Sequence, residues 1–350
     1  MTILTVIVAI IGFGIIIMIH EAGHFFVAKK CGIRVLEFSI GMGPAIISKQ
    51  KGETKYSWRL FPIGGYCAME GEDESSDDPR AFRKQKVWKR MLVTVAGAVM
   101  NLILGFFLII LVTCIDTAIT STTIAEFHTD ENGVSVAASE QWLKPDDRFI
   151  SINGLHIFTA QDISYALKND DCDTFTVVVE RGGEEITLEN VEFLDRETQG
   201  LLDFYVYGQK KTVGSVLSYT CKNFVSTARL IWISLIDLIR GKYGFHDLSG
   251  VVGIVDATAN YVQQSRSFRE ACMTLFELMS FITINVGIFN LIPFPALDGG
   301  RLVFLIIEAI RRKQIPAKVE GMIHFVGLAA LMLLMIAITF QDISKIFTSQ

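Results

Sequence analysis

The residues whose types and spacing are most informative about chemistry are His20, Glu21 and His24, which form the pattern His-Glu-x-x-His. On a helix, side chains four residues apart lie on one face, so both imidazoles can bind one Zn²⁺ ion, and the glutamate beside them can accept a proton from water. A chance match is expected in on the order of one in 200 chains of this composition. The pattern therefore predicts a hydrolytic zinc site with His20 and His24 as ligands and Glu21 as general base.

A catalytic zinc ion usually has three protein ligands, and the third must come from elsewhere in the chain. The best candidate is Asp298, because prolines and glycines flank it in the segment NLIPFPALDGGR. These residues interrupt a helix, and irregular backbone at membrane depth is tolerated where it lines a cavity enclosed by protein or filled with water. Glu277 and Glu308 are alternatives, although each lies in a longer helical pattern without such a break.

The composition places this chemistry in a membrane. Hydrophobic residues make up 51% of the 350 residues, and the net charge of −5 provides no basic field for binding nucleic acid. Four stretches are long and apolar enough to cross a bilayer: residues 3–19 with their continuation to 28, 91–115, 272–291 and 321–340. We therefore expect a multi-span α-helical membrane protein with four transmembrane helices.

The short loops predict the orientation of these helices. Residues 29–90 contain 13 Lys and Arg, residues 294–320 contain five, and the N-terminus contains none. Because basic loops stay in the cytoplasm, both termini should be extracytoplasmic, with the zinc site toward the cytoplasmic side. Residues 116–271 contain 23 Asp and Glu against 13 Lys and Arg, and they should lie outside.

The outer segment contains a β-rich module over about residues 122–207, where short alternating runs are separated by turn residues. Residues 141–154, QWLKPDDRFISING, resemble the turn, strand and Asn-Gly turn of bacterial PDZ domains, and the edge of such a sheet can accept an extended chain. A generic β-sandwich insert is the alternative. Residues 213–240 have a helical period interrupted by charges, which favours an amphipathic helix on the membrane surface over a span.

These patterns divide the chain into successive parts. The predicted boundaries are 1–29 for the first transmembrane helix with the zinc motif, 30–90 for a cytoplasmic-side loop with β-hairpins, 91–115 for the second transmembrane helix, 116–212 for the extracytoplasmic PDZ-like domain, 213–271 for the amphipathic helix and connector, 272–318 for the third transmembrane helix with the Leu-Asp-Gly segment, and 319–350 for the fourth helix and tail.

Three features occur together in this chain: the zinc motif at the end of a first span, an outer PDZ-like module, and the Asn-x-x-Pro-x-Pro-x-Leu-Asp-Gly-Gly segment after a third span. In this combination the chain resembles the site-2 protease family of RseP/RasP-type intramembrane zinc proteases. The resemblance covers nearly the whole chain and implies Zn²⁺ bound by His20, His24 and Asp298, with Glu21 as general base. It further implies a membrane-reentrant β-sheet after the first helix. About 85 residues leave room for one PDZ domain, as in the shorter relatives of Gram-positive type.

The resemblance also implies a substrate and the residues that bind it. Expected substrates are single-span membrane proteins, such as anti-sigma factors, and remnant signal peptides, cut in a bacterial cytoplasmic membrane. The PDZ-like domain would bind a peptide or protein ligand. The residues expected to contact substrate are Asn290, Gly41, Gly43, Pro293 and Pro295.

Two other functions would fit part of the pattern. A membrane-anchored PDZ adaptor would need no metal, and an unrelated membrane zinc protease would recruit a glutamate in place of Asp298. The remaining histidines add little to either. His128, His156 and His246 should lie outside, and His324 is expected to be packed or interfacial and not a ligand.

Overall fold

The computed structural model describes residues 3–193, 202–244, 250, 253 and 267–348, apart from residues 73, 75, 131 and 171. The chain divides into two compact units. One consists of residues 1–108 and 231–350, and the other of residues 109–230. His246, and most of the connector expected between residues 240 and 271, lie outside the described residues.

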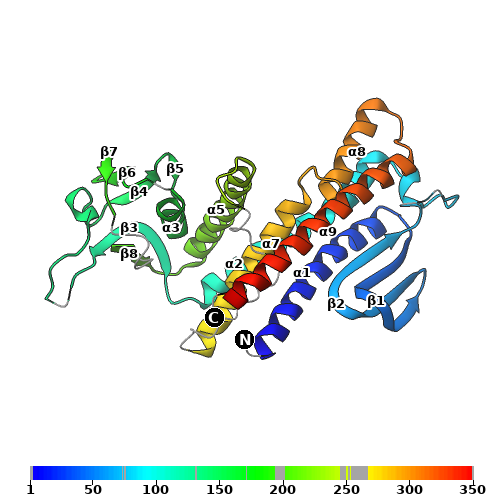
Figure 1. The fold of residues 1–350 in the computed structure, drawn as a ribbon, viewed down its shortest axis with the longest axis horizontal. Helices are drawn as coiled ribbons and strands as arrows, with labels where there is room; N and C mark the ends of the chain where they lie inside the picture. Colours follow the sequence, from blue (N-terminus) through cyan, green and yellow to red (C-terminus); the bar gives the residue numbers. More distant parts are fainter. Residues whose placement is uncertain are drawn as a thin grey trace. The chain divides into compact units, whose positions relative to one another are not determined.

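Four helices of the described chain are long and apolar enough to cross a bilayer, in agreement with the sequence prediction. They are α1 (Ile3–Lys30), α2 (Val87–Ile115), α7 (Phe268–Asn290) and α9 (Ala317–Thr348). Figure 1 shows α1, α7 and α9 as long helices that run in nearly the same direction. Each helix is longer at one or both ends than the apolar stretch predicted from the sequence. The additional residues do not have to be apolar, since a bilayer would cover only the apolar stretch.

Small residues set the distance between these helices. A Cβ at Gly287 of α7 would lie 3.0 Å from the Ala98 carbonyl oxygen of α2. A Cβ at Gly105 of α2 would lie 2.4 Å from Cγ1 of Ile284. Lipid tails are as apolar as leucine, so helices in a membrane associate mainly through close van der Waals packing, which glycine permits.

A bent β-hairpin follows α1 and consists of β1 (Val35–Lys51) and β2 (Thr54–Met69), which Figure 1 shows beside α1. Residues 37–40 of β1 pair on one side with residues 65–68 of β2 and on the other with residues 55–58. Residues 47–51 then pair with residues 54–58. The hairpin therefore folds over itself, and the first half of β1 lies in the interior of the sheet.

The short helix α8 (Asp298–Arg311) follows α7 after an irregular segment. Its Glu308 accepts two hydrogen bonds from Arg90 of α2, at 2.8 and 2.9 Å, and both side chains are buried. A buried carboxylate without a cation would be costly, so this pair fixes α8 against the N-terminal end of α2.

The second unit has a sheet of the order β7-β6-β4-β3-β8, to which β5 is joined through β4. Its strands are β3 (Ile119–Phe127), β4 (Arg148–Ile152), β5 (Leu155–His156), β6 (Phe175–Arg181), β7 (Glu184–Val191) and β8 (Phe204–Gln209), with helix α3 (Ala160–Asn169) beside them. Inward-facing residues such as Phe149, Ile163 and Phe175 form its core. Gly182 and Gly183 take positive φ at the β6–β7 turn, as tight hairpin turns require.

Helix α5 (Val213–Ile239) is not among the four candidate spans. Its Arg229 donates a hydrogen bond to the buried carboxylate of Asp162 at 2.7 Å, and Ser226 donates another at 2.5 Å. Arg229, one of the charges that favoured an amphipathic helix on the membrane surface, therefore binds helix α3 of its own unit, as Ser226 does.

Replacing Gly287 by leucine should destabilise the helix bundle, because the new side chain needs space held by the Ala98 carbonyl and Leu102. Overpacking of this kind costs about 1–3 kcal/mol, which thermal unfolding in detergent should show as a lower midpoint. Gly321 of α9 is the matched control, since a Cβ there meets nothing within 4 Å. Equal effects of leucine at both positions would contradict the close contact between α2 and α7.

Candidate metal centre

Two imidazoles from α1 and one carboxylate from α8 meet at a single point. The Asp298 Oδ2 atom lies 3.2 Å from His20 Nε2 and 3.4 Å from His24 Nε2. The two Nε2 atoms are 3.2 Å apart. Among the described residues these three form a group whose donor atoms all lie within 4.8 Å of one another. The nearly 280 residues between the histidines and the aspartate make this convergence a property of the tertiary fold.

The donor set fits Zn²⁺, which prefers imidazole nitrogen and carboxylate oxygen in a tetrahedral arrangement. The Oδ2 atom of Asp298 is buried without a hydrogen-bond partner, and a cation would compensate that oxygen. Gly97 of α2 leaves room for the two rings, because a Cβ there would lie 2.4 Å from His24 Nε2 and 2.8 Å from His20 Nε2. The space beside the two Nε2 atoms is therefore surrounded by protein but is not occupied by a side chain at position 97.

The other nitrogen of each ring is held by α2. His24 Nδ1 lies 2.8 Å from the Val93 carbonyl oxygen, to which it donates, so its Nε2 lone pair is free for a metal. His20 Nδ1 lies 3.3 Å from the side-chain amide of Asn101. Asn101 Oδ1 is buried without a partner, and an amide turned by 180° accepts the Nδ1 proton and leaves Nε2 of His20 as a ligand.

Helix α8 begins at Asp298 because the preceding backbone cannot be helical. Leu297 is extended, with φ −98° and ψ 162°, and Ala296 has φ +80°. Gly299 and Gly300 then allow the incoming chain to cross the first turn closely. A Cβ at Gly299 would lie 2.2 Å from the Ile292 carbonyl oxygen. The carboxylate also lies at the N-terminus of a helix, where the macrodipole favours a negative charge.

A cavity of about 510 Å³ opens beside the three donors. Glu21 lies on it, and its Cγ would be 3.5 Å from a Cβ at Gly65 of β2. Tyr66, Cys67, Ala68 and Met69, at the end of β2, line the same cavity. An edge of the sheet therefore runs past the glutamate and the metal donors.

The described lining of this cavity includes only one of the five residues predicted to contact substrate. Asn290 lines it, and its amide donates to the Val286 carbonyl at 2.9 Å. Gly41, Gly43, Pro293 and Pro295 are not part of the described lining.

The two glycines of β1 lie at a bend inside the sheet, and their contact with substrate stays a prediction. Both have φ +85°, and a Cβ at Gly41 would lie 2.5 Å from the Phe61 carbonyl oxygen. Period-two patterning predicts strands here, but it does not reveal the bend that decides which segment faces the cavity.

The other acidic residues and histidines that were considered as metal ligands lie elsewhere in the structure. Glu308 is bound to Arg90, and Glu277 is exposed on α7 and does not belong to the described metal group. His324 accepts a hydrogen bond from the Ala296 backbone N–H at 2.9 Å. His128 and His156 belong to the other unit.

Asn101 and Gly97, which hold and accommodate the histidines, were not predicted from the sequence. The signal was present, because Asn101 is the only amide in the apolar stretch 91–115 and follows the small residues Ala96, Gly97 and Ala98. A polar residue in a span is expensive in lipid and marks an interior contact.

The chain is similar along almost its whole length to proteins named as zinc metalloproteases. The model of peptidase family M50 matches residues 8–334. A Clostridium acetobutylicum protein named as a zinc metalloprotease is 30% identical over 346 residues, covering 98% of each chain. The regulator of sigma-W protease RasP of Bacillus subtilis is 30% identical over 428 aligned residues, covering 98% of this chain and 99% of the relative. A Fusobacterium nucleatum protein named as a zinc metalloprotease is 32% identical over 368 residues, covering 98% of this chain and all of the relative.

Replacing Asn101 by leucine should weaken zinc binding by about 10- to 100-fold, as loss of a partner to a metal-binding histidine typically does. The measurement is the zinc dissociation constant, from competition with a chelator. Asn285 of α7 is the matched control, since its amide donates to the Phe281 carbonyl of its own helix and the residue is only partly buried. Unchanged zinc affinity in Asn101→Leu would show that Asn101 does not hold His20 for the metal.

Proposed function

This chain belongs to peptidase family M50 and is a zinc metalloprotease of the site-2 type, and we propose that it hydrolyses a peptide bond within or near the transmembrane segment of single-span membrane proteins. The observation that supports this most directly is the convergence of His20, His24 and Asp298 beside Glu21. His20, Glu21 and His24 lie on α1, which is one of the four candidate membrane spans, so the chemistry would take place at membrane depth.

In the proposed mechanism, His20, His24 and Asp298 would hold Zn²⁺, and the bound ion would supply Lewis acidity for the scissile carbonyl and for water near neutral pH. Glu21 is the general base: its carboxylate accepts the proton of the attacking water and then donates it to the leaving amine nitrogen. The Val93 carbonyl and Asn101 keep both imidazoles in the tautomer and orientation that this requires.

A peptide bond in a helix is hydrogen-bonded and shielded, so the substrate must unwind before it can be cut. We propose that the unwound chain adds as a strand to the edge formed by Tyr66–Met69, because that edge lines the cavity with Glu21. Asn290, on the same cavity, would hydrogen-bond to the substrate backbone. Gly41 and Gly43 would contribute indirectly, by bending β1 so that the end of β2 reaches the site.

The second unit would be a PDZ-like domain that binds the outer part of a substrate or a separate peptide. Its antiparallel sheet with one short helix and its Gly-Gly hairpin support this proposal. The charge of the loops supports a bacterial cytoplasmic membrane location with both termini and this unit outside. Because one relative is named a regulator of sigma-W protease, anti-sigma factors are the first substrates to test, followed by remnant signal peptides.

Glu21→Gln should abolish cleavage of a single-span substrate while zinc stays bound, since glutamine cannot accept the proton. His24→Ala and Asp298→Ala should lose both zinc and cleavage, and Glu277→Ala should lose neither. Zinc content by elemental analysis and cleavage in proteoliposomes separate these cases. Full activity in Asp298→Ala would show that another residue completes the metal site.

Asn290→Ala should raise KM for a transmembrane substrate several-fold and leave zinc affinity unchanged, because the amide lies on the cavity and is not among the metal donors. Asn285→Ala, five residues earlier on α7 and not part of the described lining of the cavity, serves as the control. If KM were the same in both variants, the proposed contact of Asn290 with substrate would be wrong.

A further inference from the structure

The backbone that delivers Asp298 to the metal site contains an unfavourable conformation. Ala296, two residues before the aspartate, has φ +80°, a left-handed conformation that glycine adopts easily and other residues rarely adopt. Around it the chain turns tightly, since Phe294 N–H donates to the Ile292 carbonyl at 2.7 Å and Leu297 N–H to the Phe294 carbonyl at 3.2 Å. Such a conformation persists only where the surroundings enforce it.

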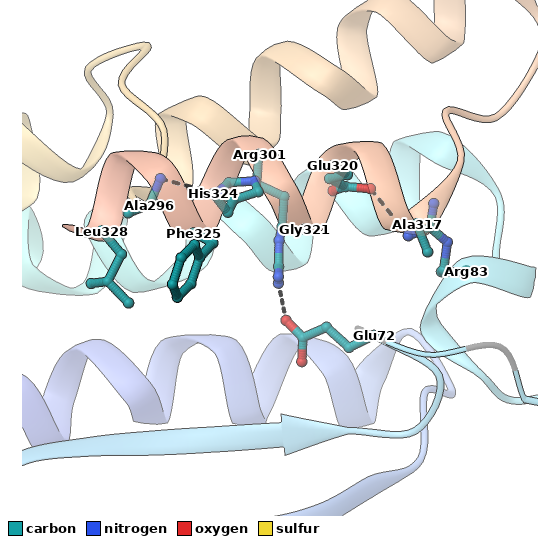
Figure 2. Close-up of a pocket in the computed structure, with 10 residues that line it drawn as sticks. All are labelled: Glu72, Arg83, Ala296, Arg301, Ala317, Glu320, Gly321, His324, Phe325 and Leu328. Atoms are coloured by element: carbon teal, nitrogen blue, oxygen red, sulfur yellow. Dashed lines mark hydrogen bonds and ion pairs between the residues drawn. The ribbon is translucent and has the colours of Figure 1, made fainter. Parts of the chain in front are cut away.

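Helix α9 supplies that enforcement through His324. Nδ1 of His324 accepts the backbone N–H of Ala296 at 2.9 Å, and Figure 2 shows the imidazole reaching from α9 toward this residue. The ring also packs edge-to-face against Phe304 of α8, with centroids 5.5 Å apart. One side chain thus connects α9, the segment before Asp298 and the helix that Asp298 begins.

Gly327 adds a second contact on the same face of α9, because residues three apart are neighbours on a helix surface. A Cβ at Gly327 would lie 2.4 Å from Cβ of Pro295 and 2.5 Å from its carbonyl oxygen. Pro295 therefore lies against the bare backbone of α9 while His324 holds the next residue. Together the two contacts leave the segment little freedom to move away from α9.

The position of Ala296 bears directly on the metal site. It lines the cavity beside the metal donors and also a second cavity of about 380 Å³ beside α9, shown in Figure 2. A relaxed, negative φ at this residue would redirect the following chain, so the Asp298 carboxylate would not reach the two histidines at 3.2 and 3.4 Å.

We propose that His324 is a positioning residue for the metal site: by accepting the Ala296 N–H it keeps the segment before Asp298 in the left-handed turn that places the carboxylate opposite His20 and His24. This inference rests on the proposed function, because it takes Asp298 to be a zinc ligand. It gives the fourth helix, which donates no ligand within the described metal group, a direct part in the metal site.

The test compares zinc dissociation constants of purified full-length variants, measured by chelator competition. His324→Leu removes the acceptor and should weaken zinc binding at least ~10-fold, the lower range for loss of an outer partner of a metal ligand. His324→Asn can place Oδ1 near the position of Nδ1, and it should stay within about threefold of wild type. Phe325→Leu, an exposed neighbour on α9, is the control and should bind zinc as wild type does.

A second substitution distinguishes positioning from simple packing. Glycine takes positive φ without strain, so Ala296→Gly should restore most of the zinc affinity of His324→Leu when the two are combined. Ala296→Val, with a β-branched residue at φ +80°, should weaken zinc binding by itself, and it serves as the test if His324→Leu does not fold.

The outcomes separate this inference from the proposed function. If Asp298→Ala bound zinc as wild type does, the ligand set itself would be wrong, and this inference would fail with it. If Asp298→Ala lost zinc while His324→Leu and Ala296→Val kept wild-type affinity, only the role of His324 would be overturned. Equal losses in His324→Leu and His324→Asn, or no recovery with Ala296→Gly, would likewise overturn it.

Discussion

The structure depends on bringing two imidazoles and one carboxylate together inside an apolar assembly. Each of these groups is costly to bury alone, and a metal cation compensates all three at once. The donors come from α1 and α8, which are far apart in the sequence, so the fold must hold these two helices in a fixed relative position. Much of the first unit can be understood as serving that requirement.

Each donor is fixed by a different neighbour. Helix α2 holds the histidines through the Val93 carbonyl and Asn101, and Gly97 lets both rings approach its backbone. The buried Arg90–Glu308 pair ties the same helix to α8. Close glycine contacts between α2 and α7 keep this arrangement compact. Rigid support of this kind is what a metal site needs, because small displacements of a ligand weaken binding.

The residues of the metal group could be named from the sequence, but several of the contacts that hold the fold together could not. His20 and His24 lie one turn apart on a single helix, so their shared face follows from helical geometry alone. Asp298 was identifiable by the prolines and glycines around it. The partner of Arg229 was not, because the helical period places it on one face of α5 but does not reveal that Asp162 lies opposite.

The sheet shows the same limit. Alternating apolar residues predict strands between residues 33 and 69, yet positive φ at Gly41, Gly43 and Gly64 bends the hairpin and decides which segment becomes the edge at the cavity. A bend changes the register, and register depends on contacts that a period-two pattern does not encode. Likewise, no spacing rule indicates that Ala296 would take a left-handed conformation.

The most direct test is to locate the zinc ion by anomalous diffraction from crystals of the full-length protein prepared with zinc. One peak is predicted, bonded to Nε2 of His20, Nε2 of His24 and a carboxylate oxygen of Asp298 at roughly 2.0–2.2 Å. A peak bonded to other side chains, or to the histidines with a carboxylate other than that of Asp298, would contradict the account.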